Sequence, residues 1–394
     1  MKVLIAGGGI GGLAAALALL KSGIDCAVYE QAPELKEIGA GLQLSPNGNR
    51  ILFALGLEKD VRHWGVQTRD KEIRLWSTGQ KWSQFDPRAG SAEQRYGFPM
   101  YLMHRGDLHS MLVAAVRRQK ADAIHVASKC AGFSQDAGGV TLELEGGRQA
   151  KGDVLIGADG LHSRIREALF GKAEAKFTGV VAWRGMVPID RLPENLRGPL
   201  SSQWIGPKGH ATCYPVRRGE LLNFVGEVER DDWRVESWIE PGTHAECLAD
   251  YPGWHPELRH IIENTLALYK WAIFLREPLP KWSMGRVSLL GDACHPTVPF
   301  LGQGANMAIE DAFVLARCLS RERDPAAALR GYEQARSERT ATIVRRSAEL
   351  QHTLHNPALA SPETAPAFVD VHFGPDKVRE RYDWIYRYDA AAAA

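Results

Sequence analysis

The chain opens with an apolar run, a glycine-rich turn and a longer Ala/Leu-rich run, a pattern typical of a strand that leads into a helix. Lys2–Ala6 is short, apolar and followed by glycines, which predicts a buried parallel strand. Residues 10–22 are rich in Ala and Leu and end at Gly23, which predicts a helix. Residues 24–29 are apolar again, so the chain is predicted to begin with a β-α-β unit.

Further along, strands and helices are predicted in turn. Residues 98–103 are apolar and precede a predicted helix at 108–119, and turn residues at 136–139 divide 126–144 into a hairpin or meander. Parallel-type strands are predicted at 153–156 and 286–290, and helices at about 303–319 and 325–354. Between 175 and 280 the chain shows short alternating strands, which predict a mostly antiparallel sheet, at 180–187, 201–205, 211–216 and 221–229.

This order of elements predicts an α/β fold in which a sheet domain is inserted into a Rossmann-like nucleotide-binding domain. Residues 1–175 would form the first part of that domain, with a short substrate-side segment near 70–100. Residues 176–280 would form the substrate-binding β-sheet domain, and 281–355 the second part of the nucleotide-binding domain with its helices. Residues 356–394 are predicted to be a C-terminal cap and tail, with an aromatic stretch at 382–388 and disorder at 390–394.

Composition and charge narrow the class of protein. The net charge is +1 and the basic residues are scattered, so no nucleic-acid partner is expected. The six cysteines form no CxxC or Cys/His cluster, which indicates reduced thiols, a cytoplasmic location and no metal site. Residues 3–20 carry no charge and resemble a membrane span or signal peptide, but their glycines favour a strand, turn and helix, so no membrane span is expected.

The first candidate site is the glycine motif, Gly7 to Gly12, at the turn between the first predicted strand and helix. Gly7, Gly9 and Gly12 follow the G-x-G-x-x-G spacing, which lets the backbone turn tightly and approach a pyrophosphate at the helix N-terminus. Glu30 lies about 20 residues further on, where a carboxylate can accept hydrogen bonds from the adenosine ribose hydroxyls. An acid there disfavours a 2′-phosphate, so FAD or NAD is expected rather than NADP.

Two more short motifs follow predicted strands. The Asp-Gly motif, Asp159-Gly160, comes after the strand at 153–156, and the Gly-Asp motif, Gly291-Asp292, comes after the strand at 286–290. In this order and at these separations from the glycine motif, they indicate a chain that holds FAD along its full length.

The loop after the Gly-Asp motif leads into a helix and is the candidate binding site for the flavin ring. Pro296, Gly302, Gly304 and Ala305 suit a loop and helix N-terminus that present backbone to a flat ligand. The positive end of that helix would stabilise an anionic reduced flavin. Arg105, at another strand-to-helix junction, is either a contact to a phosphate or flavin edge or a surface arginine paired with an acid.

With these motifs, the chain resembles the group A flavoprotein monooxygenases, the para-hydroxybenzoate hydroxylase superfamily, over essentially its whole length. It is most similar to the salicylate hydroxylases, 3-hydroxybenzoate 6-hydroxylases and 6-hydroxynicotinate 3-monooxygenases of that family. The shared pieces are the stretches 39–47, 103–105 and 291–311.

The resemblance implies an FAD-binding domain of the glutathione-reductase type, noncovalent FAD, and NADH or NADPH as a co-substrate that docks transiently. It implies that Asp292 binds the ribityl or pyrophosphate region, that Arg105 contacts the cofactor, and that Asp159-Gly160 serve both nucleotides. The implied reaction is hydroxylation of a small phenolic or N-heteroaromatic acid by O2 through a flavin C4a-hydroperoxide. A homodimer is one possible assembly.

His210 and Tyr214 are the candidate acid–base residues. They are four residues apart in a predicted strand, so both side chains leave the same face. A His at this spacing before a Tyr resembles the acid–base pair of the 3-hydroxybenzoate and 6-hydroxynicotinate enzymes, and histidine has a suitable pKa range. The alternative is that both are structural. The salicylate and 6-hydroxynicotinate enzymes place a His in the loop after the Gly-Asp motif, where this chain has Phe300, so the base is expected from the sheet.

The remaining polar candidates are interpreted as structural. His295 is expected to cap or pack near FAD, whereas Asp107, Glu310 and Asp311 are expected to be helix-end or surface acids. Arg217 and Arg218, in a predicted hairpin turn, are expected to be solvated. The functional alternatives are oxidation or epoxidation of a non-phenolic compound by the same fold, and a non-catalytic FAD-binding interaction protein.

Overall fold

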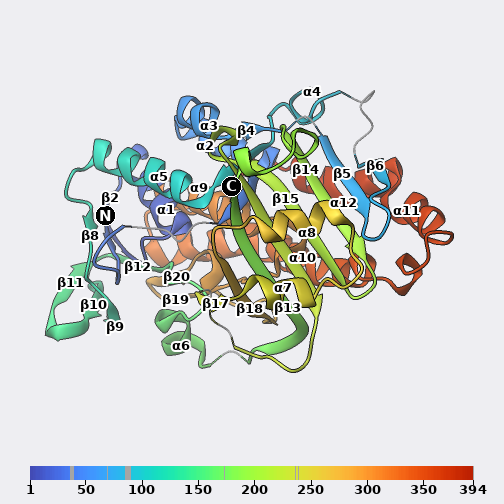
Figure 1. Ribbon diagram of the computed structural model, residues 1–394. Helices are drawn as coiled ribbons and strands as arrows, with labels where there is room; N and C mark the ends of the chain where they lie inside the picture. The colour runs from blue at the N-terminus through green and yellow to red at the C-terminus, as the bar shows by residue number, and fades with distance from the viewer. Residues whose placement is uncertain are drawn as a thin grey trace.

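A computed structural model of the chain describes residues 1–35, 40–68, 70–84, 90–172, 174–235, 237 and 239–393. It has two main sheets that lie beside each other, with helices packed around both (Figure 1). Gly39, in the first of the stretches that carry the family resemblance, lies outside the described residues.

The nucleotide-binding part is built on a six-stranded sheet. Its order is β19 (Ser283–Met284), β20 (Val287–Leu289), β12 (Val154–Gly157), β1 (Lys2–Ala6), β2 (Asp25–Tyr29) and β8 (Ile124–His125). All neighbours are parallel except the β19–β20 pair. The strands predicted from apolar runs at the start of the chain, at 153–156 and at 286–290 are therefore confirmed.

Helices bury the faces of this sheet. The helices are α1 (Ile10–Lys21), α5 (Arg105–Gln119) and α9 (Gly304–Arg321), and their apolar sides share one core with β1, β12 and β20. Central parallel strands buried on both faces are expected to be continuous runs of Val, Ile and Leu, as β1 and β12 are. Helix α5 begins three residues earlier than predicted because the His104 Nδ1 accepts from the Gly106 N–H and caps its start.

The second main sheet has eight strands and is mostly antiparallel. Its order is β17 (Glu240–Gly242), β18 (Leu268–Leu275), β13 (Lys176–Pro188), β16 (Leu221–Glu229), β15 (Gly209–Val216), β14 (Leu200–Gly206), β5 (Asp70–Leu75) and β6 (Lys81–Ser83). Strand β5 pairs in parallel with β14, so a segment from the first 100 residues completes a sheet otherwise formed by residues 176–275.

The two faces of the eight-stranded sheet pack against different helices. The short helices α7 (His244–Ala249) and α8 (Pro256–Glu263) cover its outer face, where Trp183, Trp204 and Phe224 are buried (Figure 1). The inner face packs on the loop after the Gly-Asp motif and on the C-terminal helices α10 (Pro325–Leu354), α11 (Ala365–Phe373) and α12 (Pro375–Tyr386). Because side chains alternate along a strand, each strand contributes to both cores.

Two small sheets and four more helices complete the described fold. One sheet is β3 (Gly41–Leu44), β7 (Tyr101–His104) and β4 (Val66–Gln67), and the other is β9 (Cys130–Gln135), β10 (Val140–Leu144) and β11 (Gln149–Gly152). The second contains the hairpin or meander predicted at 126–144 and adds β11 beyond it, and Asp136 Oδ1 accepts from the Gly138 and Gly139 N–H groups in the turn between β9 and β10. The helices are α2 (Pro46–Ala54), α3 (Glu58–Trp64), α4 (Ala92–Tyr96) and α6 (Arg164–Phe170).

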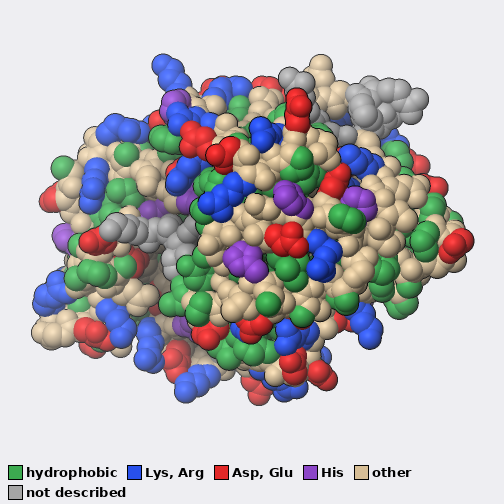
Figure 2. All heavy atoms as spheres, viewed as in Figure 1, with side chains coloured by type: hydrophobic (Ala, Val, Ile, Leu, Met, Phe, Trp, Pro, Cys, Tyr) green, Lys and Arg blue, Asp and Glu red, His purple; other side chains and the backbone are tan. Residues whose placement is uncertain are grey.

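The surface charges, the helices and the C-terminal residues can be compared with three predictions made from the sequence. Acidic and basic side chains are interspersed over the face shown in Figure 2. No helix in the described ranges is long and apolar enough to cross a membrane. The disorder predicted at 390–394 is wrong for Ala390, which is only 1% exposed and packs in the core, while Ala394 lies outside the described residues.

Candidate cofactor site and active-site face

The three motifs meet at the carboxyl edge of the six-stranded sheet, because strands β1, β12 and β20 that precede them are parallel neighbours. A Cβ added at Gly7 would lie 2.3 Å from the Ala158 carbonyl oxygen, so the glycine motif touches the backbone just before Asp159. A Cβ at Gly11 would lie 2.7 Å from Leu290 Cδ2, directly before the Gly-Asp motif. A side chain at Gly7 would push the glycine motif away from the Asp-Gly motif, and a side chain at Gly11 would push it away from the Gly-Asp motif.

Each glycine of the G-x-G-x-x-G spacing has its own geometry. Gly7 has a φ of +108°, which L side chains rarely adopt, and a Cβ at Gly12 would lie 2.0 Å from the Gly7 carbonyl oxygen. Gly9 differs from both, because a Cβ there would meet nothing within 4 Å. Gly7 and Gly12 are thus required by the fold itself, whereas Gly9 leaves backbone open at the N-cap of α1.

Glu30 lies over the glycine motif. Its Oε2 accepts from the Gly8 N–H at 2.7 Å, and its Oε1 accepts from the Ala32 N–H at 2.8 Å. A carboxylate has about four acceptor sites, so these two bonds fix its orientation and leave capacity for ribose hydroxyls. That contact to the ribose stays a prediction.

Asp159 organises the turn of the Asp-Gly motif. Its carboxylate accepts from the Ser163 hydroxyl at 2.5 Å and from the Arg164 N–H at 2.7 Å, at the start of helix α6. Burial raises its pKa, and these hydrogen bonds act in the opposite direction. Gly160 has a φ of +75°. Both oxygens of Asp159 thus bond to the protein, and its role toward either nucleotide stays a prediction.

The Gly-Asp motif presents an exposed carboxylate at the same edge. Gly291 has a φ of +65° and its N–H donates to Asp311 Oδ2 at 3.3 Å, while the side chain of Asp292 is exposed. The half-buried Pro296 follows, and Gly302, with a φ of +64°, ends the loop.

Helix α9 begins directly after that loop, with Gly304 and Ala305 in its first turn. No side chain caps its first N–H groups, because the N-cap Gln303 side chain bonds to Ser45 and Asn47 instead. Helix α1 is likewise uncapped by a side chain. In the described part of the chain, two helix N-termini without a side-chain cap, open backbone at Gly9 and the carboxylate of Asp292 are the donor and acceptor set that a flavin dinucleotide requires.

Arg105 occupies the first position of α5, and its N–H donates to the Ala40 carbonyl oxygen at 2.8 Å. The stretches 40–47 and 103–105, both part of the family resemblance, are therefore neighbours through the pairing of β3 with β7. The contact of the Arg105 side chain with the cofactor stays a prediction.

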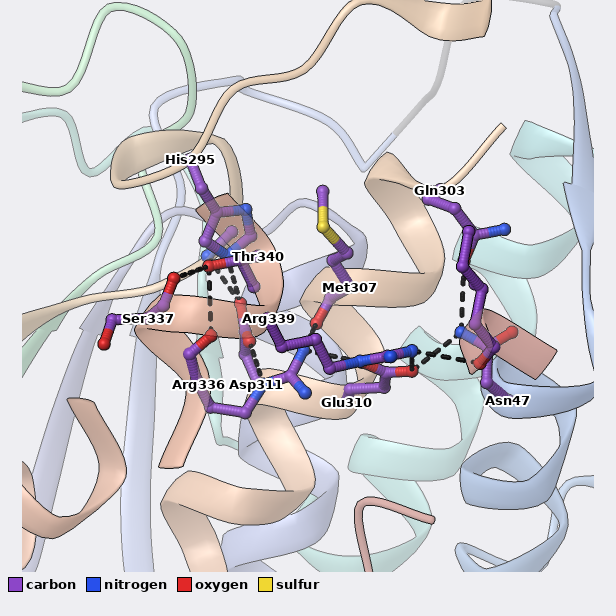
Figure 3. A network of polar contacts seen from close by, with 12 residues as sticks. Asn47, His295, Gln303, Met307, Glu310, Asp311, Arg336, Ser337, Arg339 and Thr340 are labelled. Atoms are coloured by element: carbon purple, nitrogen blue, oxygen red, sulfur yellow. Dashed lines mark hydrogen bonds and ion pairs between the residues drawn. The ribbon is translucent and has the colours of Figure 1, made fainter. Parts of the chain in front are cut away.

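A buried ionic network lies behind the loop and corrects the prediction for Glu310 and Asp311. Both side chains are fully buried, and both residues lie in the interior of α9 rather than at a helix end or on the surface. Arg336 of α10 lies between the two carboxylates (Figure 3). Arg336 is 2.6 Å from Glu310 Oε2 and 2.7 Å from Asp311 Oδ1, and Arg339 is 3.0 Å from Glu310 Oε1. Burial would raise the pKa of Glu310, but the two arginines outweigh it and hold that pKa below its usual value.

The network connects the pieces that carry the family resemblance. Asn47 donates to Glu310 at 2.7 Å and to Gln303 at 3.1 Å, and His295 Nε2 lies 2.5 Å from Asp311 Oδ2 (Figure 3). The stretches 40–47 and 291–311 are thus fixed to each other through buried polar side chains. His295 is buried within the motif and binds the network, while its position near FAD stays a prediction.

Cys294, His295 and Asp311 place a sulfur, a nitrogen and an oxygen close enough together to hold a metal ion. However, Asp311 already binds His295 and Arg336, and Cys294 Sγ donates to the Gly291 carbonyl oxygen at 3.3 Å. A guanidinium on the same carboxylate disfavours a cation, so the cluster is better explained as part of the ionic network.

His210 lies on the inner face of β15, buried against the loop that follows the Gly-Asp motif. Its ring lies 5.5 Å from the ring of Phe300. Its Nδ1 is 2.7 Å from His355 Nε2, and its Nε2 is 3.2 Å from Glu227 Oε2, outside hydrogen-bond geometry. Burial, then the charges of His355 and Lys71, hold the pKa of His210 well below its usual value.

Tyr214 lies on the same face but contacts a different part of the protein. A Cβ at Gly41 would lie 2.6 Å from its ring, and the Gly41 N–H donates to the neighbouring Asn223 at 2.7 Å. Four residues of strand span about 13 Å, and no hydrogen bond joins Tyr214 to His210 in the described chain. The structure therefore does not bring the two into one hydrogen-bonded pair, and burial separately raises the pKa of Tyr214.

Sequence reasoning missed four polar residues on or beside this inner face. Glu227 pairs with His210 across β15 and β16, and burial raises the pKa of its carboxyl to about 8. Arg184, on β13, is buried with its guanidinium over the rings of Tyr269 and Trp271. The other two are Lys71, a buried cation on β5, and His355 at the end of α10. None of them belongs to a short motif.

Arg217 is partly solvated, with its side chain 38% exposed, but it also has a partner that the sequence did not suggest. It lies in the β15–β16 turn, and its guanidinium donates to Asp107 Oδ1 at 3.1 Å, in the first turn of α5. Asp107 is therefore a helix-end acid, as expected, but one that fixes the sheet to the nucleotide-binding part. Arg218, beside it, lies over the ring of Trp64.

Comparisons with known proteins cover almost the whole chain. Residues 1–347 match a family described as an FAD binding domain. The chain is 37% identical over 391 residues to 3-amino-4-hydroxybenzoate 2-monooxygenase PtnB3 of Streptomyces platensis, covering 99% of this chain and 96% of that protein. It is 38% identical over 393 residues to 3-hydroxybenzoate 6-hydroxylase of Polaromonas naphthalenivorans, again covering 99% and 96%.

A solved structure extends the comparison to three dimensions. Klebsiella pneumoniae HpxO complexed with FAD and uric acid is similar with a TM-score of 0.82 and 30% identity, over 96% of this chain and 93% of that one. The similarity therefore includes the nucleotide-binding part and the eight-stranded sheet alike.

Proposed function

The chain belongs to the FAD-binding family of flavin-dependent aromatic monooxygenases, and on that premise we propose that it hydroxylates a small aromatic acid with His210 as the base. The substrate class is a phenolic or N-heteroaromatic acid. The co-substrates are O2 and NADH or NADPH. The relatives named for their reactions act on hydroxybenzoates, and the aligned HpxO structure holds FAD with a purine.

One observation carries the proposed role of His210. The loop after the Gly-Asp motif leads to the helix whose N-terminus suits a flavin, and Phe300 in that loop contacts the His210 ring. A base on the sheet therefore lies beside the loop that would hold the reactive ring. Phe300 itself cannot move a proton, which leaves this task to the sheet.

Bound flavin, once reduced by the nicotinamide nucleotide and exposed to O2, supplies the electrophilic oxygen atom. The chain has to hold the aromatic ring and remove its phenol proton, because a phenolate is a more electron-rich ring for electrophilic attack. With Nδ1 of His210 bonded to His355, Nε2 is the nitrogen left to accept that proton.

The same sheet face carries positive charge for an acidic substrate. Arg184 and Lys71 are both buried on it, 5% and 8% exposed. Cations near a binding site attract an anionic ligand more strongly than a neutral one of the same shape, so these side chains favour a carboxylate over a carboxamide. We propose that they set the preference for aromatic acids.

The test is a screen of aromatic acids for stimulated NADH oxidation, with the product identified by mass. 3-Hydroxybenzoate, 3-amino-4-hydroxybenzoate, salicylate and 6-hydroxynicotinate are the first compounds, and the carboxamide of each is its matched control. At least one acid should stimulate NADH oxidation and gain one oxygen atom, while its carboxamide should require a higher concentration. Oxidation of NADH that is indifferent to every acid would favour a non-phenolic oxidation or a non-catalytic role.

The finer points of location and assembly stay proposals. The unclustered cysteines support a cytoplasmic location, and a homodimer is the assembly to be tested. Gel filtration of the holoprotein measures its oligomeric state directly.

A further inference from the structure

Three titratable side chains form a line from the inner face of the sheet to the surface. His210 Nδ1 is 2.7 Å from His355 Nε2, and His355 Nδ1 is 3.2 Å from Glu229 Oε1. The two rings are 2% and 3% exposed, whereas the Glu229 side chain is 38% exposed. The line therefore begins at the proposed base and ends in water.

The backbone holds this line in place. His355 caps the end of α10, and its carbonyl oxygen accepts from the Lys208 N–H at 3.2 Å. The Lys208 carbonyl oxygen in turn accepts from the Glu229 N–H at 2.8 Å. The helix end, the β14–β15 turn and the end of β16 are thus bonded to one another around the three side chains.

The hydrogen bonds determine which ring nitrogens carry protons. The hydrogen bond from His355 and the nearby charges keep the pKa of Glu229 below its usual value, so Glu229 is an acceptor only. His355 Nδ1 must then donate, which makes its Nε2 the acceptor in the neutral ring. His210 Nδ1 must donate to that nitrogen, and the lone pair of His210 is left on Nε2.

The other charged groups around His210, His355 and Glu229 favour transfer of a proton toward Glu229. His210 faces Glu227 from β16 and Lys71 from β5, whereas His355 faces Glu229, whose own neighbour is the cation of Lys208. Burial raises the pKa of Glu227 to about 8, so at neutral pH this carboxyl already holds a proton and cannot accept another. Because burial also lowers the pKa of His210, a proton received there has to be passed on.

We infer that His355 and Glu229 carry the substrate proton from His210 to solvent and fix His210 in the tautomer that can accept it; this rests on the proposed function. The phenol O–H bond breaks, its electron pair stays on oxygen, and the proton bonds to His210 Nε2. The Nδ1 proton of His210 moves to His355 Nε2, and the Nδ1 proton of His355 moves to Glu229 and then to water. A proton that returns along the same path to the product phenolate resets both rings. His355 and Glu229 are positioning and relay residues.

The tautomers can be measured without turnover, by nitrogen NMR of the FAD-loaded protein labelled at histidine. His210 and His355 should both carry their proton on Nδ1 in the wild type. Glu229→Ala should convert a large part of both rings to the Nε2–H form, because it removes the acceptor. The matched control is Glu220→Ala, an exposed acid in the β15–β16 turn that pairs with Arg218. A wild-type His210 protonated on Nε2, or tautomers unchanged by Glu229→Ala, would overturn the inference.

Proton movement is followed by stopped-flow mixing of the FAD-loaded protein with 3-hydroxybenzoate and a pH-indicator dye. In the wild type, phenolate absorbance and released protons should rise together. Glu229→Ala and His355→Leu should slow both by roughly tenfold or more, with partial rescue by acetate and imidazole respectively, while Glu220→Ala should not. Wild-type rates in both variants, or slow rates without rescue, would contradict the relay. No phenolate in the wild type with any acid that is hydroxylated would overturn the base role of His210, and the relay with it.

Discussion

Arg336 and Asp311 form an ion pair, Nε to Oδ1 at 2.7 Å, in which both side chains are fully buried. Glu310 completes the pairing on the other side of the same guanidinium. Arg336→Met should lower the free energy of unfolding by about 3 kcal/mol, because two buried carboxylates would lose a partner. Thermal or urea unfolding of the holoprotein measures this.

Arg345→Met is the control for that prediction. Arg345 is exposed on the same helix, and its loss should change stability by less than about 0.5 kcal/mol. Equal effects of the two substitutions would contradict a stabilising role for the buried pair.

Gly9→Ala and Gly12→Ala should fail in different ways. A Cβ at Gly9 meets nothing within 4 Å, so that variant should fold normally and bind FAD roughly tenfold more weakly or worse. A Cβ at Gly12 would lie 2.0 Å from a backbone oxygen, so that variant should fold poorly even before FAD is added. Circular dichroism and FAD titration separate the two, and normal FAD affinity in Gly9→Ala would exclude a close backbone approach.

Asp292→Ala should lose FAD more severely than Arg105→Ala. The exposed carboxylate of Asp292 makes charge-assisted hydrogen bonds to cofactor hydroxyls in the proposed site, and these are roughly twice as strong as neutral ones. Acid precipitation of the wild type should release all flavin as FAD. Wild-type flavin content in Asp292→Ala would show that the Gly-Asp motif does not hold the cofactor.

The burial of Glu227 predicts a pH-dependent loss of stability. The pKa of its carboxyl is about 8 in the folded protein, against 4.5 for an ordinary Glu. Between these two pH values the Glu227 carboxyl is ionised only in the unfolded chain, so rising pH lowers the free energy of unfolding. Glu227→Gln should therefore gain stability relative to the wild type from pH 4.5 to 8, by at most about 5 kcal/mol, and the gain should level off above that. Urea midpoints across this range measure it, and a constant difference would mean that Glu227 ionises normally.

His210→Ala should uncouple NADH oxidation from hydroxylation. FAD binding and its reduction by NADH with substrate present should persist, while the hydroxylation step falls on the order of a hundredfold and hydrogen peroxide appears instead. The dependence of that step on pH should lose the limb that reflects His210, which lies below the usual histidine range because burial lowers the pKa of His210. Tyr214→Phe is the matched comparison on the same face, and normal coupling in His210→Ala would make this histidine a packing residue.

Local spacing explains what the sequence could predict. The glycine, Asp-Gly and Gly-Asp motifs each lie directly after an apolar strand, and parallel strands bring their carboxyl ends together, so the cofactor edge follows from order alone. The family resemblance, the α/β fold and the FAD cofactor are confirmed by the comparisons.

What the sequence did not reveal depends on partners far along the chain. Glu310 looks like a surface acid until Arg336 and Arg339 are packed against it, and His355 is 145 residues from His210. One signal was present but unused, since Arg336 falls on the buried stripe of α10 with Tyr332 and Thr340, four residues on each side. A charge on an apolar stripe indicates a buried partner.

Both the ionic network and the six-stranded sheet depend on segments that are far apart along the chain. Arg339 stacks on Tyr388 at 3.7 Å and bonds the carbonyl oxygens of Trp384 and Ile385, so the last residues cover the ionic network. Strand β1 lies beside β12, which in turn pairs with β20 near residue 288. Neither the sheet nor the cover over the buried charges can therefore form from local contacts alone, and contacts between distant segments make folding slow.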